Sequence, residues 1–406
     1  MKTRVFACLA AGLWMSGMCH ADTVSIGVFS LFSPRSVVIQ AKDAGRYQMV
    51  LRDTALHGWT GGAKSASIEL RLRGSTLAVV ENGKTAAQSQ VQPGERVAVS
   101  KDEVAGAPFS FTLAAGTRRD SLRRNYRGGL SFLISSEKGQ PAFIVPVVTE
   151  DIEQYCAEVA ASELPPGTPQ EALKAQVVVC RSYAVFYRGE KRHKGHDFCD
   201  TTHCQFWKGT DASQTGRRAQ EAAEKTRGEV LTFSGRVAPG FFCGCCAGMT
   251  ATPELIWAES PVPGAYTQVA CPHSETAELA SWVRRVSWSE LCRRAKVDPS
   301  TVRPVSFEVG EASAAGGYVR TVLMDGKAIP AEKFRSLIAA GWGWNTIPGL
   351  SFTLRKEGDD LVIEGKGSGH GIGLCQAGAA VLARQKKTYI EILSHYFPEM
   401  RVEKGL

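Results

Sequence analysis

The sequence predicts an exported α+β protein in which a β-rich region precedes a mixed α/β region. Short runs that alternate polar and apolar residues fill the chain from residue 22 to about 120. Helical periodicity with cap signals begins after residue 148. Residues 1–21 have the basic start, short apolar core and small residues of a secretory signal peptide. We therefore divide the chain into residues 1–21, 22–120 and 121–406.

Composition and charge limit the classes of function. The chain is 44% apolar and 22% charged, which is typical of a globular protein, and it has no run long enough to span a bilayer. Loss of Lys2 and Arg4 with the signal lowers the net charge from +8 to +6. This excess suits an anionic polymer such as cell-wall glycan, whereas nothing in its distribution indicates nucleic acid. We expect a periplasmic, cell-wall or extracellular location; a lipid anchor at Cys19 is disfavoured because Met18 is bulky.

The first elements are strands. Residues 67–72 alternate polar and apolar side chains, and Asn82 with Gly83 predicts a turn between strands. This region has no catalytic constellation, so we expect a β-sandwich or barrel-like accessory unit. Residues 126–134 then predict a turn into a strand, and residues 142–148 predict another strand.

Two helices follow. Residues 149–151 start a helix that runs to about Ser162. Thr168 as cap, Pro169 and Glu171 predict a capping box at the start of the second helix, and Gly189 predicts its end. The buried face of this second helix is predicted to contain Leu173, Val177, Cys180 and Ala184. Glu163 therefore lies at the junction of the two helices.

The later elements are a strand at residues 227–233 with a turn at Ser234, a strand at 361–363 and a helix at about 377–384. A glycine run at residues 365–373 joins the last two. It does not fit the dinucleotide pattern Gly-x-Gly-x-x-Gly at any start. Closely spaced glycines instead let the backbone approach a ligand or another segment. His370 in this run either binds substrate or packs in a structural turn.

Cysteines are the most informative residues. Ten of the twelve remain after the signal is lost, and an oxidising compartment makes disulfides the default for them. Residues 199–205 hold two cysteines and a histidine, with His193 and His196 just upstream. Three interpretations stay open at this point: a structural zinc that uses His193, the same site with His196, or a disulfide with surface histidines.

Glu163 is the candidate acid. A carboxylic acid in a partly apolar cleft keeps its proton near neutral pH and can donate it to a glycosidic oxygen. Ordinary glycosidases need a second carboxylate as nucleophile or base. Asp197 and Asp200 are available in the loop, but the sequence assigns neither of them that role.

Taken together, these residues resemble the stage II sporulation protein D family, which includes amidase enhancers. The resemblance begins near residue 126, runs almost to the end and leaves the β-rich region outside it. It rests on motifs at residues 126–128, 162–165, 171–176, 181–184, 199–205, 226–228, 246–250, 369–379 and 395–398.

The resemblance implies a sporulation protein D-type domain with lytic transglycosylase activity on peptidoglycan. Such enzymes cleave the β-1,4 bond between N-acetylmuramic acid and N-acetylglucosamine. One glutamate acts as acid and base, and the C6 hydroxyl of the sugar closes an anhydro ring. The family's glutamate falls on Glu163. The zinc ligands implied are His193, Cys199, His203 and Cys204, and we expect substrate to contact Arg181, Tyr183, Gln205, His370 and Gln376.

Two alternatives remain. The first is a non-catalytic protein that binds wall glycan and enhances a cell-wall amidase. The second is a zinc hydrolase, which would need an open coordination position. The chain also departs from the family pattern Cys-Gly-Gly-x-Thr, because Ala247 replaces a glycine and Cys243 and Cys245 add thiols. These changes affect the shape of the groove more than the acid.

Overall fold

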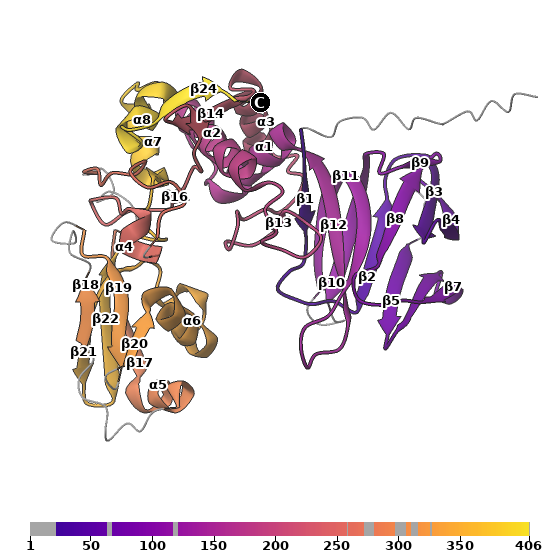
Figure 1. Ribbon diagram of the computed structural model, residues 1–406, viewed down its shortest axis with the longest axis horizontal. Coiled ribbons are helices and arrows are strands. Elements are labelled where there is room, and N and C mark those ends of the chain that lie inside the picture. The colour runs from indigo at the N-terminus through magenta and orange to yellow at the C-terminus, as the bar shows by residue number, and fades with distance from the viewer. Residues whose placement is uncertain are drawn as a thin grey trace, which may run out of the picture.

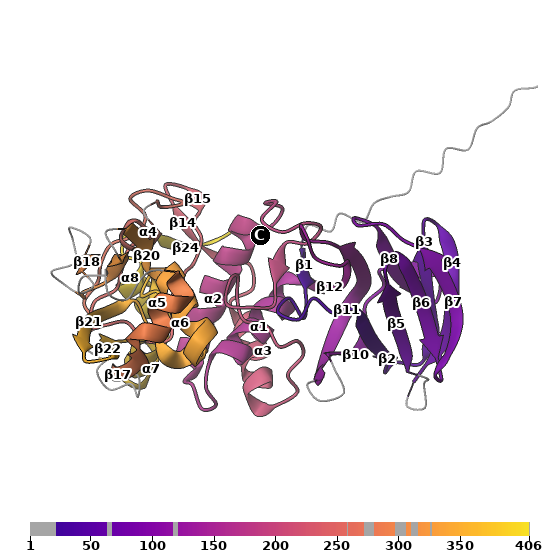
Figure 2. The ribbon, with the colours of Figure 1, turned by 90° about the horizontal axis from the view of Figure 1, so that it is seen from below.

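The computed structural model describes residues 22–62, 67–116, 121–257, 259–271, 280–296, 306–309, 316–324 and 327–405. The protein has 25% helix and 41% strand, in agreement with the predicted α+β class. The predicted signal peptide lies outside the described residues. A β-rich lobe forms one end of the molecule, a group of helices lies in the middle, and a C-terminal lobe forms the other end (Figures 1 and 2). Among the described residues, no helix is long and apolar enough to cross a membrane.

The β-rich lobe consists of antiparallel strands, as the alternating pattern predicts. The predicted strand at residues 67–72 and the turn at Asn82 and Gly83 are both present. Its strands are β1 (Thr23–Gly27), β2 (Ser36–Ala41), β3 (Gly45–Leu51), β4 (Thr54–Gly61), β5 (Ile68–Arg73), β6 (Thr76–Glu81), β7 (Lys84–Gln90), β8 (Arg96–Lys101), β9 (Val104–Ala105), β10 (Phe109–Gly116), β11 (Ser121–Ser135) and β12 (Phe143–Asp151).

Strand β11 belongs to two sheets. Its first half pairs with β10 and leads to β2, β5, β6 and β7, whereas its second half pairs with β12 and β8. The predicted turn at residue 126 is therefore wrong, since the strand continues through it. Gly128 makes this possible: its φ is 128°, and a Cβ there would lie 2.3 Å from the carbonyl oxygen of Thr149. The glycine serves a close strand approach rather than a turn.

One aromatic core joins the β-rich lobe to the helices. The rings of Tyr47 on β3 and Phe109 on β10 lie 4.8 Å apart, which brings the two sheets together. Tyr126 on β11 contacts Trp207 at 5.2 Å, and Trp207 contacts Tyr155 in the first helix at 5.9 Å. The hairpin of β10 and β11 also crosses the proposed boundary near residue 120, which stays a prediction.

The three central helices are α1 (Ile152–Glu163), α2 (Gln170–Tyr187) and α3 (Gln214–Lys225). Helix α1 is capped by the carboxylate of Asp151, which accepts hydrogen bonds from the backbone N–H groups of Glu153 and Gln154. In α2 the predicted buried face and the end at Gly189 are confirmed, since that glycine has a φ of 79°.

The predicted capping box at the start of α2 is wrong. The Thr168 hydroxyl donates to the carbonyl of Pro165 at 2.7 Å, and Pro169 occupies the cap position without a side-chain bond. Glu171 instead pairs with Lys174 and accepts the N–H of Tyr389 at 2.8 Å. The carboxylate therefore connects α2 to the C-terminal part of the chain rather than to its own cap.

A buried ion pair fastens these helices. Arg181 of α2 has 0% exposure, and its Nε donates to Glu153 Oε1 of α1 at 3.0 Å, while a second N–H group reaches the other carboxylate oxygen. The same Oε1 accepts the N–H of Gly228 at 2.9 Å, and Arg181 Nη1 donates to the carbonyl of Glu229 at 3.0 Å. The pair therefore joins α1, α2 and the chain that leaves α3.

The C-terminal lobe is an excursion from this centre. Its described residues form two three-stranded sheets, three α-helices and one short 3₁₀ helix, and the chain then returns to α2. Its elements are α4 (Pro253–Trp257), β17 (Ser281–Ser287), α5 (Trp288–Ala295), β18 (Ser306–Val309), β19 (Val319–Met324), β20 (Lys327–Pro330), α6 (Ala331–Trp342), η2 (Trp344–Thr346), β21 (Ser351–Glu357) and β22 (Asp360–Lys366).

The returning chain packs on α2 and closes a second core. The predicted strand at 227–233 and the predicted helix at 377–384 are present in this part of the molecule, and the predicted strand at 361–363 is part of β22 in the C-terminal lobe. Its elements, with the short strands that pair with them, are β14 (Glu229–Phe233), β15 (Arg236–Val237), β16 (Phe242–Cys243), β23 (Leu374–Cys375), α7 (Gln376–Arg384), α8 (Tyr389–Tyr396) and β24 (Arg401–Lys404). Ala175 and Val179 of α2 lie in this core with Ile392 and Leu393 of α8.

We expect Arg181→Met to lower the free energy of unfolding by about 3–5 kcal/mol, because the Glu153 carboxylate would stay buried without its partner. Chemical denaturation followed by circular dichroism measures this change. The control is Lys387→Met, which removes a pair with Glu391 whose side chains are 51% and 47% exposed and should cost less than about 1 kcal/mol. Equal losses in the two variants would contradict the role of the buried pair.

Candidate active site

The cysteine loop is held by the first strand of the described chain. Strand β13 (Phe198–Cys199) pairs in parallel with β1, so that Cys199 lies opposite Gly27. The Asp197 carboxylate accepts the N–H of Ser25 at 2.8 Å and its hydroxyl at 2.6 Å. The loop is therefore a fixed part of the β-rich lobe.

The structure brings together four donors of this loop. The ligand atoms of His193, Cys199, His203 and Cys204 all lie within 4.8 Å of one another. His193 Nε2 lies 3.2 Å from Cys204 Sγ, and His203 Nδ1 lies 3.5 Å from Cys204 Sγ and 3.8 Å from Cys199 Sγ. Bonds of about 2.0–2.3 Å in a tetrahedral zinc site place its donors about 3.3–3.8 Å apart. The four residues fit such an ion.

His196 does not belong to this group. Its ring stacks on His193 with centroids 5.0 Å apart and covers Gly27, where a Cβ would lie 2.5 Å from His196 Nε2. The packing therefore favours His193 over His196 as the candidate ligand, because His196 lies against β1 whereas His193 faces the cysteines.

Glu163 is the last residue of α1 and is half-buried. Its Oε1 accepts the backbone N–H of Phe206 at 2.9 Å, two residues beyond Cys204. Burial raises the pKa of Glu163 to about 7, although the Phe206 N–H and the charge of Lys208 lower it. No carboxylate is among the causes of this shift within the described chain. Glu163 is therefore positioned to hold a proton near neutral pH.

Asp197 and Asp200, the two other carboxylates of the loop, are occupied. Asp197 also accepts the N–H of Gly189 at 3.0 Å. Asp200 accepts the N–H of Phe29 at 2.9 Å and pairs with Arg124 at 2.9 Å. Both acids secure the loop, and neither offers a free carboxylate to act with Glu163.

Three of the five predicted substrate residues are buried. Arg181 has its guanidinium committed to Glu153, so its place is structural rather than in a binding groove. Tyr183 is 5% exposed, and its hydroxyl accepts from Arg192 Nη1 at 2.8 Å. Gln205 is 1% exposed and lies in the chain between a metal-ligand candidate and the Phe206 N–H. These three residues therefore support the site from the protein interior.

The other two predicted substrate residues, His370 and Gln376, come from the returning chain. Gln376 Nε2 donates to Gln176 Oε1 at 3.3 Å, and Gln176 Nε2 donates to Cys180 Sγ at 3.3 Å. Burial raises the pKa of Cys180, and the nearby charge of Glu163 adds to this rise. Gln376 is thus connected to the vicinity of Glu163 through two α2 side chains.

His370 lies in an aromatic group with Phe241 and Trp257. Its ring is 5.3 Å from that of Trp257 and 6.3 Å from that of Phe241, which in turn lies 6.2 Å from Tyr183. Burial lowers the pKa of His370 to about 4, and its Nδ1 accepts the N–H of Ile372 at 3.0 Å. The ring is therefore neutral, and its Nε2 carries a proton available for donation. Sequence analysis missed Phe241 and the Phe206 N–H, because neither position carries a motif of its own.

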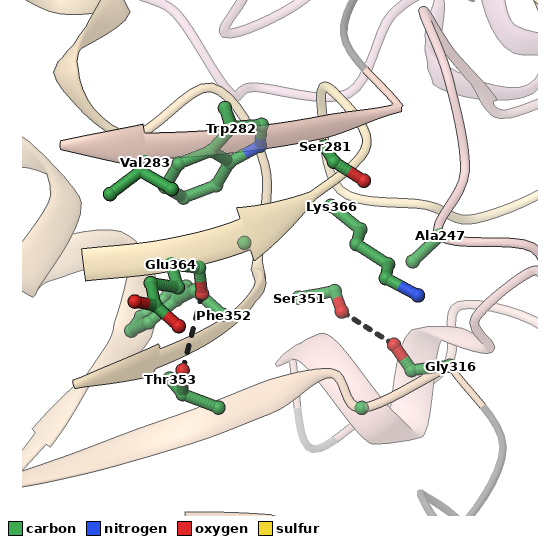
Figure 3. A pocket seen from close by; sticks show the side chains of 12 residues that line it. Ala247, Ser281, Trp282, Val283, Gly316, Ser351, Phe352, Thr353, Glu364 and Lys366 are labelled. Carbon is green, nitrogen blue, oxygen red and sulfur yellow. Dashed lines mark hydrogen bonds between the residues drawn. The ribbon is translucent and has the colours of Figure 1, made fainter. Parts of the chain in front are cut away.

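A cavity lies elsewhere, in the C-terminal lobe. It has a volume of about 670 Å³ and is lined by Trp282, Glu364 and Lys366 from β17 and β22, with Ala247 at its margin (Figure 3). Its lining includes neither Glu163 nor any of the four grouped donors. Ala247, which lines the cavity, directly follows Cys246 in the chain.

Comparisons with known proteins now bear on the site. Residues 144–233 match a family model described as stage II sporulation protein. A protein of Brachyspira hyodysenteriae, described as uncharacterized, is 30% identical over 281 residues, which cover 67% of this chain and 70% of that protein. The chain belongs to the stage II sporulation protein D family.

Named relatives agree with this assignment. Stage II sporulation protein D of Bacillus subtilis is 25% identical over 267 residues, covering 63% of this chain and 75% of the relative. An amidase enhancer of Bacillus subtilis is 24% identical over 287 residues, but only 39% of its length is covered. The sporulation protein D match contains α1, α2 and the cysteine loop, so Glu163 and the four donors all lie inside it.

In this sporulation protein D-type site, we expect His193→Ala to lower the affinity for zinc by more than about 100-fold, because the ion loses one of its direct ligands. His196→Ala should retain zinc, since its ring packs on Gly27. Elemental analysis measures the zinc content of each purified variant relative to that of the unaltered protein. Retention by His193→Ala together with loss by His196→Ala would contradict the ligand set.

We also expect Glu163→Gln to stabilise the fold by about 1–3 kcal/mol at pH 8 and by little at pH 4. The raised pKa of Glu163 means that the native state holds its proton more tightly than the unfolded chain, so stability is lost as pH rises from about 4.5 to 7. Gln lacks this loss. Denaturation at several pH values measures the difference.

The control for that series is Glu171→Gln. Its hydrogen bonds with Lys174 and the Tyr389 N–H lower the pKa of Glu171, so its contribution has the opposite sign. That variant should lose stability at pH 8. A pH-independent effect of Glu163→Gln would show that the acid is not held protonated by the fold.

Proposed function

We propose that this protein is an exported lytic transglycosylase that cleaves the β-1,4 bond between N-acetylmuramic acid and N-acetylglucosamine in peptidoglycan, leaving 1,6-anhydro ends. The observation that carries the proposal is the setting of Glu163. Its carboxyl group is half-buried and fixed by the Phe206 N–H, and its pKa is raised to about 7. Membership of the sporulation protein D family and a relative named amidase enhancer support a role at the cell wall.

Glu163 acts first as an acid. It donates its proton to the glycosidic oxygen as the bond to the anomeric carbon breaks, and positive charge develops on the sugar ring. The resulting carboxylate then accepts the proton of the C6 hydroxyl, whose oxygen closes the anhydro ring. One carboxylate suffices because the substrate supplies the nucleophile. This agrees with Asp197 and Asp200 being engaged in holding the loop.

His193, Cys199, His203 and Cys204 would hold a zinc ion that braces the loop. Four protein ligands leave no position for a catalytic water, so the ion supplies rigidity rather than Lewis-acid chemistry. The loop in turn positions the Phe206 N–H on the acid. In this proposal Phe241, Trp257 and His370 form an aromatic and polar wall for a sugar, in which Trp257 offers an apolar face and His370 an Nε2–H donor.

The second candidate is an enhancer that binds glycan and stimulates a wall amidase without cleaving the strand. The relative named amidase enhancer favours it. In that role the same wall of aromatic and polar side chains would bind glycan, and Glu163 would contribute a hydrogen bond rather than a proton.

The deciding experiment digests purified peptidoglycan with the protein and with Glu163→Gln, and identifies the products by mass spectrometry. We expect anhydro-muramyl products from the unaltered protein and a loss of at least about 1,000-fold in the variant, because proton donation is removed. The rate should fall as pH rises above about 7, since the acid must be protonated.

Glu224→Gln is the matched control, because Glu224 is an exposed residue of α3. It should cleave at the unaltered rate. Reducing-end products would mean hydrolysis by water and would contradict the transglycosylase. Glycan binding without products from either protein, combined with stimulation of an amidase, would favour the enhancer.

A further inference from the structure

A second group of cysteines converges on the far side of α2 from the β-rich lobe. Five thiols come from the β16 segment, from the chain just after it, from the segment that ends at residue 271 and from the junction of β23 with α7. All are at most 4% exposed. They are Cys243, Cys245, Cys246, Cys271 and Cys375. The disulfides that an oxidising compartment makes the default are not formed among the ten described cysteines of this structure.

Three of these thiols form a compact triangle. The Sγ atoms of Cys246, Cys271 and Cys375 all lie within 4.8 Å of one another. The pairing of β16 with β23 places Cys243 opposite Cys375, and Cys245 directly precedes Cys246 in the chain. Disulfides require only pairs of sulfurs, whereas an ion gathers several. A tetrahedral ion with metal–sulfur bonds of about 2.3 Å separates its sulfurs by about 3.8 Å, so small shifts would seat one ion.

The surroundings of Cys375 suit a thiolate. Its Sγ accepts the backbone N–H groups of Cys246 and of Gly378, each at 3.4 Å, and it caps the N-terminus of α7. Backbone donors and the positive end of a helix favour the negative charge that a metal ligand needs. The Tyr396 hydroxyl lies 3.0 Å from Cys271 Sγ as a further polar neighbour.

The space around these thiols is closely packed at Gly378. A Cβ at this position would lie 2.6 Å from Cys271 Sγ and 2.1 Å from the Tyr396 hydroxyl oxygen. Only glycine lets α7 approach so closely to the sulfur. The helix, the tyrosine and three chain segments therefore meet at one point.

Cys243 and Cys245 differ as candidates for a fourth ligand. Cys243 lies directly opposite Cys375 in the pairing of β16 with β23. Cys245 Sγ instead makes a hydrogen bond to the carbonyl oxygen of Cys246 at 3.4 Å. The strand pairing thus favours Cys243.

We propose that Cys246, Cys271 and Cys375, with Cys243 as the fourth ligand, form a second, thiolate-rich metal site that takes a single soft divalent ion of the zinc class. With four sulfur ligands the site is structural. It fastens the β16 segment, the segment that ends at residue 271 and the start of α7 to one another, beside Phe241 and the loop that carries His370. It is independent of the transglycosylase chemistry and of the site at the cysteine loop.

Metal content of the intact protein, purified without chelator, tests this proposal. We expect two zinc ions per chain in the unaltered protein, and one each in Cys246→Ser/Cys271→Ser and in Cys199→Ser/Cys204→Ser. In the latter protein, cobalt(II) should give the strong ultraviolet absorption of sulfur-to-cobalt charge transfer. Cys243→Ser added to that protein should weaken this absorption, whereas Cys245→Ser should leave it unchanged. Cys292→Ala, outside both groups, should keep two ions.

Two results would overturn the proposal. One is a single zinc per chain in the unaltered protein, with intact mass after thiol alkylation showing disulfides among the five cysteines. The other is a protein with Cys199→Ser/Cys204→Ser that binds no cobalt. If a serine variant fails to fold, cobalt titration of the unaltered protein still decides, because two sites of different sulfur content give two distinct spectra. A weaker signal from Cys245→Ser instead of Cys243→Ser would overturn the assignment of the fourth ligand.

Discussion

The buried pair of Glu153 and Arg181 is the contact on which the arrangement of the central helices depends. Two charges removed from water are tolerated here because backbone groups at Gly228 and Glu229 complete their hydrogen bonds. The pair sets the position of α1 against α2. It therefore also sets the distance between Glu163, at the end of α1, and the row of Gln176 and Cys180 on α2.

The acid and the cysteine loop form one unit. The N–H that fixes Glu163 belongs to Phe206, two residues after a grouped thiol, and the Ser162 hydroxyl accepts the N–H of Lys208 at 3.1 Å. A change in the loop would therefore move a hydrogen bond that lowers the pKa of the acid. The aromatic and polar wall formed by Phe241, Trp257 and His370 comes from a different part of the chain than the acid and the cysteine loop. The wall can therefore change in sequence without altering either of them.

Local signals in the sequence predicted local structure well. The buried face of α2, its end at Gly189 and the clustering of donors around residues 199–204 follow from periodicity and spacing. Long-range partners were not predictable: a sequence does not reveal that Arg181 meets Glu153, or that Tyr389 takes the Glu171 carboxylate from the expected cap. Nor does it reveal that the His196 ring packs on Gly27, although that packing favours His193 over His196 as the candidate metal ligand.

The pairing of β1 with β13 has a consequence for how the chain acquires its structure. Ser25 and Asp197 are separated by 172 positions, yet they share four hydrogen bonds. Contacts of such long sequence separation form late and slow the folding rate. The grouped donors can therefore reach their final geometry only after Ser25 and Asp197 have come together. Cutting the protein near residue 120 would separate these two partners.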